Sequence, residues 1–236
     1  MAYGLILISE NLMKTKINLP TKITISRIVL SFLLILTIVL IYIFDEFKPF
    51  VNKANIYLNN DGTYVNYIMI ILFGIFLLTS LTDFLDGYLA RKNNEVTDLG
   101  KFLDPIADKM LVNSMLIFLS INFKSISNSH SSIPFFCVIL MIIRDLIVDG
   151  LRLMAANKQI VISANIFGKL KTVFQMITIS LVMLNGFPFN LLDNLWMRYL
   201  HISDIMCYIT TIISLLSGTI YITKNIHVII GGKNNE

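Results

Sequence analysis

The chain has 236 residues, of which 56% are hydrophobic and only 14% are charged, with a formal net charge of +4. A soluble domain usually carries about 25% charged residues, so this composition excludes an ordinary soluble protein and predicts an integral membrane protein with no nucleic-acid partner. The two cysteines, Cys137 and Cys207, lie in apolar segments. We expect them to be small buried hydrophobes rather than a disulfide or metal framework.

The N-terminal residues 1–22 are expected to form a cytoplasmic segment. The first of them, MAYGLILISENL, have no basic region and only a very short apolar stretch, so we expect no cleavable signal peptide. The segment could form an interfacial amphipathic helix, because apolar residues stand beside Lys14 and Lys16. A frayed terminus is the alternative, and the sequence does not favour either.

Apolar segments of helical length follow one another along the rest of the chain. A helix of about 20 residues crosses a hydrocarbon core of about 30 Å. We therefore expect an all-α bundle of six transmembrane helices in residues 23–225, followed by a cytoplasmic tail, 226–236. The expected spans are 23–44, 65–89, 104–123, 133–156, 166–186 and 201–223. The second, third and fourth carry aspartates or arginines near an end, so hydropathy alone would shorten them.

The positive charges predict the orientation of these spans, because cytoplasmic loops are rich in Lys and Arg. With the N-terminus inside, 15 of the 19 Lys and Arg residues fall on the cytoplasmic side. The exceptions are Lys48, Lys53, Lys124 and Arg198. Both termini are therefore expected to be cytoplasmic. The connections on the outer side, 45–66 and 122–134, are polar and rich in turn-forming residues.

Four aspartates stand at helical spacing in the stretch LTDFLDGYLARKNNEVTDLGKFLDPIADKML. Asp83 and Asp86 are three residues apart, and Asp104 and Asp108 are four apart, so each pair shares one face of a helix. The first pair lies near the inner end of the second span, and the second pair is expected to open the third. The connection is short enough for a hairpin, so we expect the four carboxylates to converge.

Converging carboxylates are costly in a membrane protein. One aspartate at the membrane centre costs roughly 2.5–3.5 kcal/mol on insertion scales, and like charges repel further. Divalent cations offset both terms, and all-oxygen ligands favour Mg²⁺, Mn²⁺ or Ca²⁺ over zinc. Two ions about 3.5–4 Å apart are typical of displacement at phosphorus. A loop whose acids merely face water is the alternative, but Gly87 and Ala90 leave room for a ligand, and Pro105 suits the first turn of a helix.

These residues fit the pattern D-x-x-D-G-x-x-A-R-x8-G-x-x-x-D-x-x-x-D. The fixed positions are Asp83, Asp86, Gly87, Ala90, Arg91, Gly100, Asp104 and Asp108. With this pattern the chain resembles the CDP-alcohol phosphatidyltransferase family, which is also built of six membrane helices, so the resemblance extends over nearly the whole chain. It implies an enzyme of the cell membrane that acts at the cytoplasmic face on a CDP-linked lipid.

The resemblance also implies a role for each matching residue. The four aspartates match the family's ligands for two divalent ions, Mg²⁺ or Mn²⁺, and Asp108 also matches its general base. The stretch LPTKITISR ahead of the first span resembles the segment that contacts the nucleotide. The residues implied in binding CDP are Thr21, Thr24, Gly87, Ala90, Arg91, Thr97 and Gly100. The residue types suit this chemistry, since a carboxylate can accept a hydroxyl proton and Arg91 can hold two phosphate oxygens.

A second group of charges lies in and after the fourth span. Arg144 and Arg152 are eight residues apart, about two helical turns, so they share a face. Lys169 and Lys171 open the fifth span. A basic pocket suits an acceptor that carries its own phosphate, whereas the competing interpretation is that these cations only mark the cytoplasmic side.

The stretches RDLIVDGLR and GKLKT resemble the phosphatidylglycerophosphate synthase branch of the family. That branch joins glycerol 3-phosphate to CDP-diacylglycerol and releases CMP, which implies these two substrates here. Serine, inositol phosphate and a second phospholipid are alternative acceptors within the family. A membrane prenyltransferase and a cation transporter are alternatives outside it, but the first would carry two separated Asp-rich motifs and the second acids near mid-membrane in repeated halves. A homodimer is implied by the resemblance alone.

Overall fold

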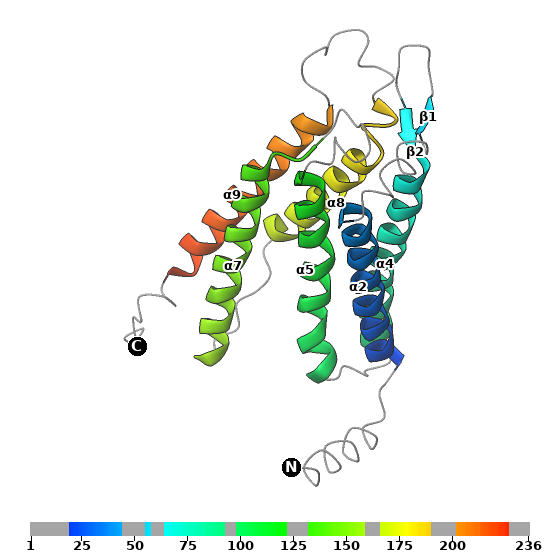
Figure 1. Ribbon diagram of the computed structural model, residues 1–236. Helices are drawn as coiled ribbons and strands as arrows, with labels where there is room; N and C mark the ends of the chain where they lie inside the picture. Colours follow the sequence, from blue (N-terminus) through cyan, green and yellow to red (C-terminus); the bar gives the residue numbers. More distant parts are fainter. Residues whose placement is uncertain are drawn as a thin grey trace. The chain divides into compact units, whose positions relative to one another are not determined.

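A computed structural model describes residues 19–43, 55–57, 64–92, 98–121, 132–158, 166–189 and 202–226. This part of the chain is mostly helical (Figure 1). The helices are α2 (Leu19–Ile43), α4 (Tyr67–Lys92), α5 (Asp98–Ser120), α7 (Phe135–Asn157), α8 (Ile166–Met183) and α9 (Ile202–Lys224). The chain divides into two compact units, Met1–Leu36 with Ile75–Leu111 and Thr37–Gly74 with Val112–Glu236.

Each of the six expected spans corresponds to one of these helices, and the largest difference is at the start of α5. That helix begins at Asp98 rather than at Asp104, so Pro105 lies inside it and not in its first turn. The prediction was wrong because it began the helix where the apolar run begins, whereas backbone hydrogen bonding continues through polar residues. Pro105 lacks an N–H, so the helix gives up one internal hydrogen bond there. Helix α2 likewise begins at Leu19, four residues before the expected start.

A short hairpin precedes α4, within the segment expected to be an irregular outer connection. Strands β1 (Asn55–Tyr57) and β2 (Tyr64–Asn66) pair antiparallel, with Ile56 opposite Val65. Asn66 ends the second strand and caps the helix, because its Oδ1 accepts hydrogen bonds from the backbone N–H groups of Ile68 and Met69 at 3.0 and 3.3 Å. The all-α prediction therefore missed this small sheet.

Three stretches of the described helices are long and apolar enough to cross a membrane. They are Thr21–Leu40, Ile166–Met183 and Ile202–Lys224, with mean hydropathies of 2.5, 1.4 and 1.8. The apolar part of α4, Tyr67–Thr82, is shorter. The helices outside this set are α4, α5 and α7, which correspond to the spans whose aspartates or arginines lower the hydropathy.

In the unit that contains residues 19–36, α2 buries one face from end to end. The buried residues recur every three or four positions, as one face of a helix requires: Thr21, Thr24, Arg27, Ser31 and Leu34. The opposite face exposes large apolar side chains, Val29, Phe32 and Leu33 among them. A helix with polar residues buried and apolar residues outside suits a lipid environment rather than water.

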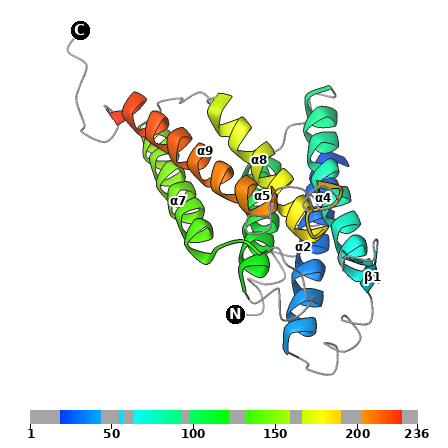
Figure 2. The same ribbon diagram turned by 90° about the horizontal axis from the view of Figure 1, so that it is seen from above.

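In the other unit, α9 packs against both α7 and α8, as the two ribbon views agree (Figures 1 and 2). The contacts give the directions of the helices. Phe136 stacks on Tyr208 and Arg152 meets Tyr221, so α7 and α9 run parallel. The hydroxyls of Thr178 and Thr210 share a 2.7 Å hydrogen bond between α8 and α9. Three successive spans of alternating direction would produce this arrangement.

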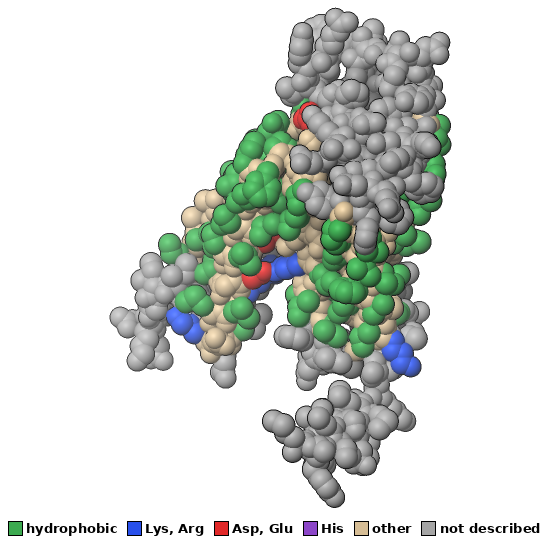
Figure 3. All heavy atoms as spheres, in the orientation of Figure 1, with side chains coloured by type: hydrophobic (Ala, Val, Ile, Leu, Met, Phe, Trp, Pro, Cys, Tyr) green, Lys and Arg blue, Asp and Glu red, His purple; other side chains and the backbone are tan. Residues whose placement is uncertain are grey.

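The seam between α7 and α9 is closely packed. Cys137 and Cys207 are both fully buried free thiols, which confirms that they act as small core residues. Val148, Leu151 and Tyr221 form a buried cluster farther along the same seam. The outer faces of both helices are apolar and exposed (Figure 3), from Phe135 to Leu153 on α7 and from Tyr208 to Leu216 on α9. A continuous exposed apolar surface of this kind is typical of contact with lipid.

Candidate functional site

The four aspartates of the sequence pattern lie on two helices of one compact unit. Asp83 and Asp86 are in the last three turns of α4, and Asp104 and Asp108 are in the first half of α5. The predicted helical spacing is therefore confirmed for both pairs. Gly87, Ala90 and Arg91 continue α4, and Gly100 lies in the first turn of α5, whereas Thr97 lies outside the described residues.

Asp108 is the one aspartate of the four whose side chain the structure describes. It is partly buried and has an interaction partner, and the buried Ala107 precedes it in α5. Among the described side chains, no group of three or more His, Cys, Asp or Glu gathers in one place. That set does not include Asp83, Asp86 or Asp104, so convergence of the four carboxylates stays a prediction.

The two threonines expected to contact a nucleotide lie inside a helix rather than ahead of one. Thr21 and Thr24 are in the first two turns of α2, one turn apart, and are 3% and 2% exposed. Both have interaction partners. Their burial on the same face as Arg27 places three polar side chains along the helix end that belongs to the aspartate-bearing unit.

The other predicted cations belong to the second unit, where two of them share one carboxylate. The Arg144 Nη1–H donates to Asp145 Oδ1 at 2.9 Å, and the Lys171 Nζ–H donates to Asp145 Oδ2 at 2.5 Å. All three side chains are 9–10% exposed. We call Arg144, Asp145 and Lys171 the charge cluster. It joins α7 to α8, and each carboxylate oxygen of Asp145 accepts a hydrogen bond from one of the two cations.

Burial makes the charge cluster costly to disturb. Removing one partner from a buried ion pair costs about 3–5 kcal/mol, because the remaining charge is left uncompensated. Asp145 carries one negative charge against two positive ones, so the three side chains together carry a net positive charge. The sequence analysis missed this pairing because Lys171 approaches from another helix, 26 residues away.

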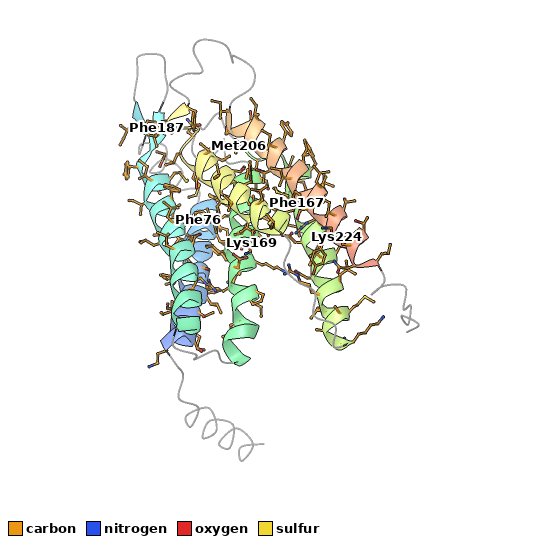
Figure 4. All side chains as sticks on the ribbon, turned by 180° about the vertical axis from the view of Figure 1, so that it is seen from behind. Phe76, Phe167, Lys169, Phe187, Met206 and Lys224 are labelled. Atoms are coloured by element: carbon orange, nitrogen blue, oxygen red, sulfur yellow. The ribbon has the colours of Figure 1, made fainter. Side chains whose placement is uncertain are left out.

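Arg152 and Lys169 are the exposed members of the predicted acceptor set. The Arg152 Nε–H donates to the Tyr221 hydroxyl at 3.3 Å, and its Cζ lies 5.4 Å from the centre of that ring. Lys169 lies near the start of α8 (Figure 4). The exposed cations are therefore free to meet a solute, whereas Lys171, two residues farther along α8, is buried in the charge cluster.

Helix α9 supplies partners that the sequence analysis did not identify. The Arg144 Nη2–H donates to Ser217 Oγ at 2.7 Å, and Tyr221, one turn later, meets Arg152. The predicted common face of the two arginines is thus confirmed by their common neighbour. The signal was the sequence SLLSGTIY, in which small and polar residues interrupt an otherwise apolar helix at positions that a close helix contact favours.

The sequence pattern that defines the CDP-alcohol phosphatidyltransferase family matches residues 17–220. The chain is also similar to proteins named CDP-diacylglycerol–glycerol-3-phosphate 3-phosphatidyltransferase. The protein of Bacillus subtilis (strain 168) is 36% identical over 208 residues, which cover 88% of this chain and 95% of that protein. The protein of Mycoplasma pneumoniae (strain ATCC 29342) is 33% identical over 209 residues, 86% of each chain. The protein of Rickettsia bellii is 31% identical over 89% of this chain and 96% of its own length.

Proposed function

The chain belongs to the CDP-alcohol phosphatidyltransferase family, and we propose that it transfers the phosphatidyl group of CDP-diacylglycerol to glycerol 3-phosphate. The products are phosphatidylglycerol phosphate and CMP. The observation that carries this proposal is the 36% identity with the Bacillus subtilis transferase over 95% of that protein's length. The basic side chains of α7 and α8 support the same acceptor, because they suit an alcohol that already carries a phosphate.

In this reaction a hydroxyl oxygen of glycerol 3-phosphate attacks the phosphorus that bears the diacylglycerol. A new P–O bond forms, and the bond from that phosphorus to CMP breaks. The hydroxyl proton needs an acceptor, and Asp108 takes it in our proposal, as a carboxylate within hydrogen-bond reach can. Asp108 is suited to this by its place in α5, where its side chain is partly buried rather than fully solvated.

Two divalent ions, Mg²⁺ or Mn²⁺, are proposed to bind Asp83, Asp86, Asp104 and Asp108. The donor set fits, because it consists of carboxylate oxygens, which hard cations prefer. The spacing fits as well, since α4 and α5 place each pair within one helical turn. When bound, such ions neutralise the pyrophosphate oxygens and make CMP a better leaving group.

The CDP group is proposed to bind along the same unit. Gly87 and Ala90 leave space beside the aspartates, and the Arg91 guanidinium can donate two hydrogen bonds to phosphate oxygens. Thr97 and Gly100 follow in the connection and in the first turn of α5. Thr21 and Thr24 complete the set in our proposal, and their hydroxyls can both donate and accept.

The phosphate of glycerol 3-phosphate is proposed to bind Arg144, Arg152, Lys169 and Lys171. Arg152 and Lys169 are exposed and can meet the acceptor from solution. Arg144 and Lys171 are held by Asp145, so they contribute fixed positive charge with little ordering left to do on binding. A preorganised buried pair together with two exposed cations suits an anion that must enter and leave.

We further propose six membrane spans with both termini in the cytoplasm and the reaction at the cytoplasmic face of the cell membrane. Three described stretches meet the length and hydropathy expected of a span, and the distribution of Lys and Arg supports the orientation. The catalytic domain would cover 23–225, between the N-terminal segment 1–22 and the tail 226–236. A homodimer is part of the proposal on family grounds alone.

An acceptor panel tests the function. The purified protein in detergent is incubated with CDP-diacylglycerol and Mg²⁺, and CMP release is followed with glycerol 3-phosphate, glycerol, serine or inositol phosphate. We expect CMP with glycerol 3-phosphate and little with glycerol, its matched control without a phosphate. Equal rates with glycerol and glycerol 3-phosphate would contradict the proposed phosphate-binding site. If no acceptor led to CMP release, the proposed transferase activity would be wrong.

A further inference from the structure

Helix α9 approaches Arg144 so closely that residue 218 has no room for a side chain. A Cβ atom added to Gly218 would lie 2.6 Å from Cγ and 3.0 Å from Nε of Arg144. Real Cβ atoms essentially never come closer than 3.0 Å to a neighbour, so the arginine would have to move. Cγ belongs to the stem of that side chain rather than its free end, and a shift of the stem carries the guanidinium with it.

The close approach is specific to this position among the glycines whose surroundings the structure describes. A Cβ added at Gly74, Gly150 or Gly168 would meet nothing within 4 Å. Gly218 is also buried, in the middle of the seam between α7 and α9. The glycine therefore serves the neighbouring arginine and not the helix that contains it, because a glycine inside a helix is less stable there than alanine.

Both terminal nitrogens of the Arg144 guanidinium are held by hydrogen bonds. Nη1 donates to Asp145 and Nη2 donates to Ser217. Nε is buried and has no hydrogen-bond partner within the described part of the chain. Nε lies against α9, since a Cβ on Gly218 would approach it to 3.0 Å, so α9 closes off that edge of the guanidinium.

We infer that Gly218 and Ser217 of α9 are positioning residues for the phosphorylated acceptor, acting through Arg144. Gly218 lets the stem of Arg144 lie against α9, and Ser217 fixes one terminal nitrogen, so the guanidinium is already placed when the phosphate arrives. This inference rests on the proposed function, because it assigns the support of one residue of the proposed acceptor site. The competing explanation is a small residue that only lets two helices pack.

The test is a double-mutant cycle in the full-length protein, Gly218→Ala with Arg144→Ala. The KM for glycerol 3-phosphate, the KM for CDP-diacylglycerol and kcat are measured for each variant, together with thermal unfolding. A charged hydrogen bond corresponds to about 10- to 100-fold in binding, so Arg144→Ala should raise the KM for glycerol 3-phosphate by about that factor. Gly218→Ala should raise it by about 10-fold and leave the KM for CDP-diacylglycerol within about twofold.

The double variant distinguishes positioning from packing. If Gly218 acts through Arg144, adding Gly218→Ala to Arg144→Ala should cost no more than about a further twofold. The inference would be overturned if Gly218→Ala raised the KM for glycerol 3-phosphate as much in the Arg144→Ala background as it does alone. It would also be overturned if Gly218→Ala lowered thermal stability and left both KM values unchanged. The matched control is Gly150→Ala, on the helix that carries Arg144, where the same substitution meets open space.

Ser217 decides the outcome if Gly218→Ala does not fold. Ser217→Ala should raise the KM for glycerol 3-phosphate by about three- to tenfold, and Ser217→Thr, which keeps the hydroxyl, should recover part of that loss. No change with Ser217→Ala while Arg144→Ala is impaired would sink the inference and leave the acceptor site standing. No change with Arg144→Ala itself would instead remove Arg144 from the proposed function, and the inference with it.

Discussion

The aspartate pairs of α4 and α5 and the charge cluster of α7 and α8 solve the problem of charge in a membrane protein in opposite ways. In our proposal the four aspartates between Asp83 and Asp108 converge, and bound cations offset the repulsion of these like charges. The charge cluster contains its own counter-ion, since Asp145 meets both Arg144 and Lys171. The first arrangement therefore depends on a ligand for its charge balance, whereas the second is balanced in large part by the protein itself.

Substitution of an aspartate of the proposed metal site is expected to have the largest effect on activity. Asp86→Asn or Asp104→Asn should lower turnover by roughly 10³-fold or more, because metal ions contribute several kcal/mol to stabilising the transition state. The thermal midpoint in metal-free buffer should hold or rise, since one repelling charge has gone. Removal of divalent ions with EDTA should reproduce the loss reversibly in the unmodified protein. Undiminished CMP release without metal would show that the aspartates do not act through bound divalent ions.

Substitution of Asp108 should affect proton transfer more than substrate binding. If it is the general base, Asp108→Asn should slow transfer by about 10²–10⁴-fold while CDP-diacylglycerol still binds, as equilibrium binding of the lipid to the purified variant would report. The matched comparison is Asp104→Asn, which should weaken metal and nucleotide binding together. If both substitutions weaken binding equally, Asp108 is mainly a ligand and another residue is the base.

Asp145→Asn should act on stability first. Both cations of the charge cluster would lose the carboxylate that they share, which costs about 3–5 kcal/mol when the groups are buried, and the thermal midpoint in detergent should fall accordingly. Lys171→Met in the same chain removes one of the two positive charges, so the double variant should be more stable than the sum of the single losses predicts. Simple additivity would show that the two side chains are not coupled.

The aspartate region could be read from the sequence because its residues are close together along the chain. Helical spacing alone predicted that each pair shares a face, and α4 and α5 confirm it. The start of α5 was missed because hydropathy marks where a helix enters an apolar environment and not where its hydrogen bonding begins. The hairpin before α4 was missed for a related reason, since three paired residues per strand leave almost no periodicity to detect.

The basic residues of α7 and α8 could be predicted from the sequence only in part. The arginines and lysines stand out in the sequence, and their common face follows from helical geometry. Their partners do not follow, because Ser217 is 73 residues from Arg144 and the pairing depends on how α9 packs against α7. Gly218 was equally hidden, since a glycine in an apolar helix gives no sign of which neighbour needs the space.

Tyr221 should give the smallest effect and the finest comparison between the two arginines. Its hydroxyl accepts a 3.3 Å hydrogen bond from Arg152, and its ring lies under the guanidinium at 5.4 Å. Tyr221→Phe removes only the hydroxyl and should raise the KM for glycerol 3-phosphate about two- to threefold. Tyr221→Leu also removes the cation–π contact, worth about 0.5–1 kcal/mol at an exposed site, and should raise it a further two- to fivefold or so.

The control for Tyr221 is Tyr208→Phe, in the same helix, whose ring stacks on Phe136 and meets no described cation. That variant should leave the KM for glycerol 3-phosphate unchanged. Arg152→Lys should behave much like Tyr221→Leu, because an ammonium neither stacks as a guanidinium does nor donates in a planar fork. If Tyr221→Leu matches Tyr208→Phe, Arg152 does not depend on α9, and the support that α9 gives to the acceptor site is limited to Arg144.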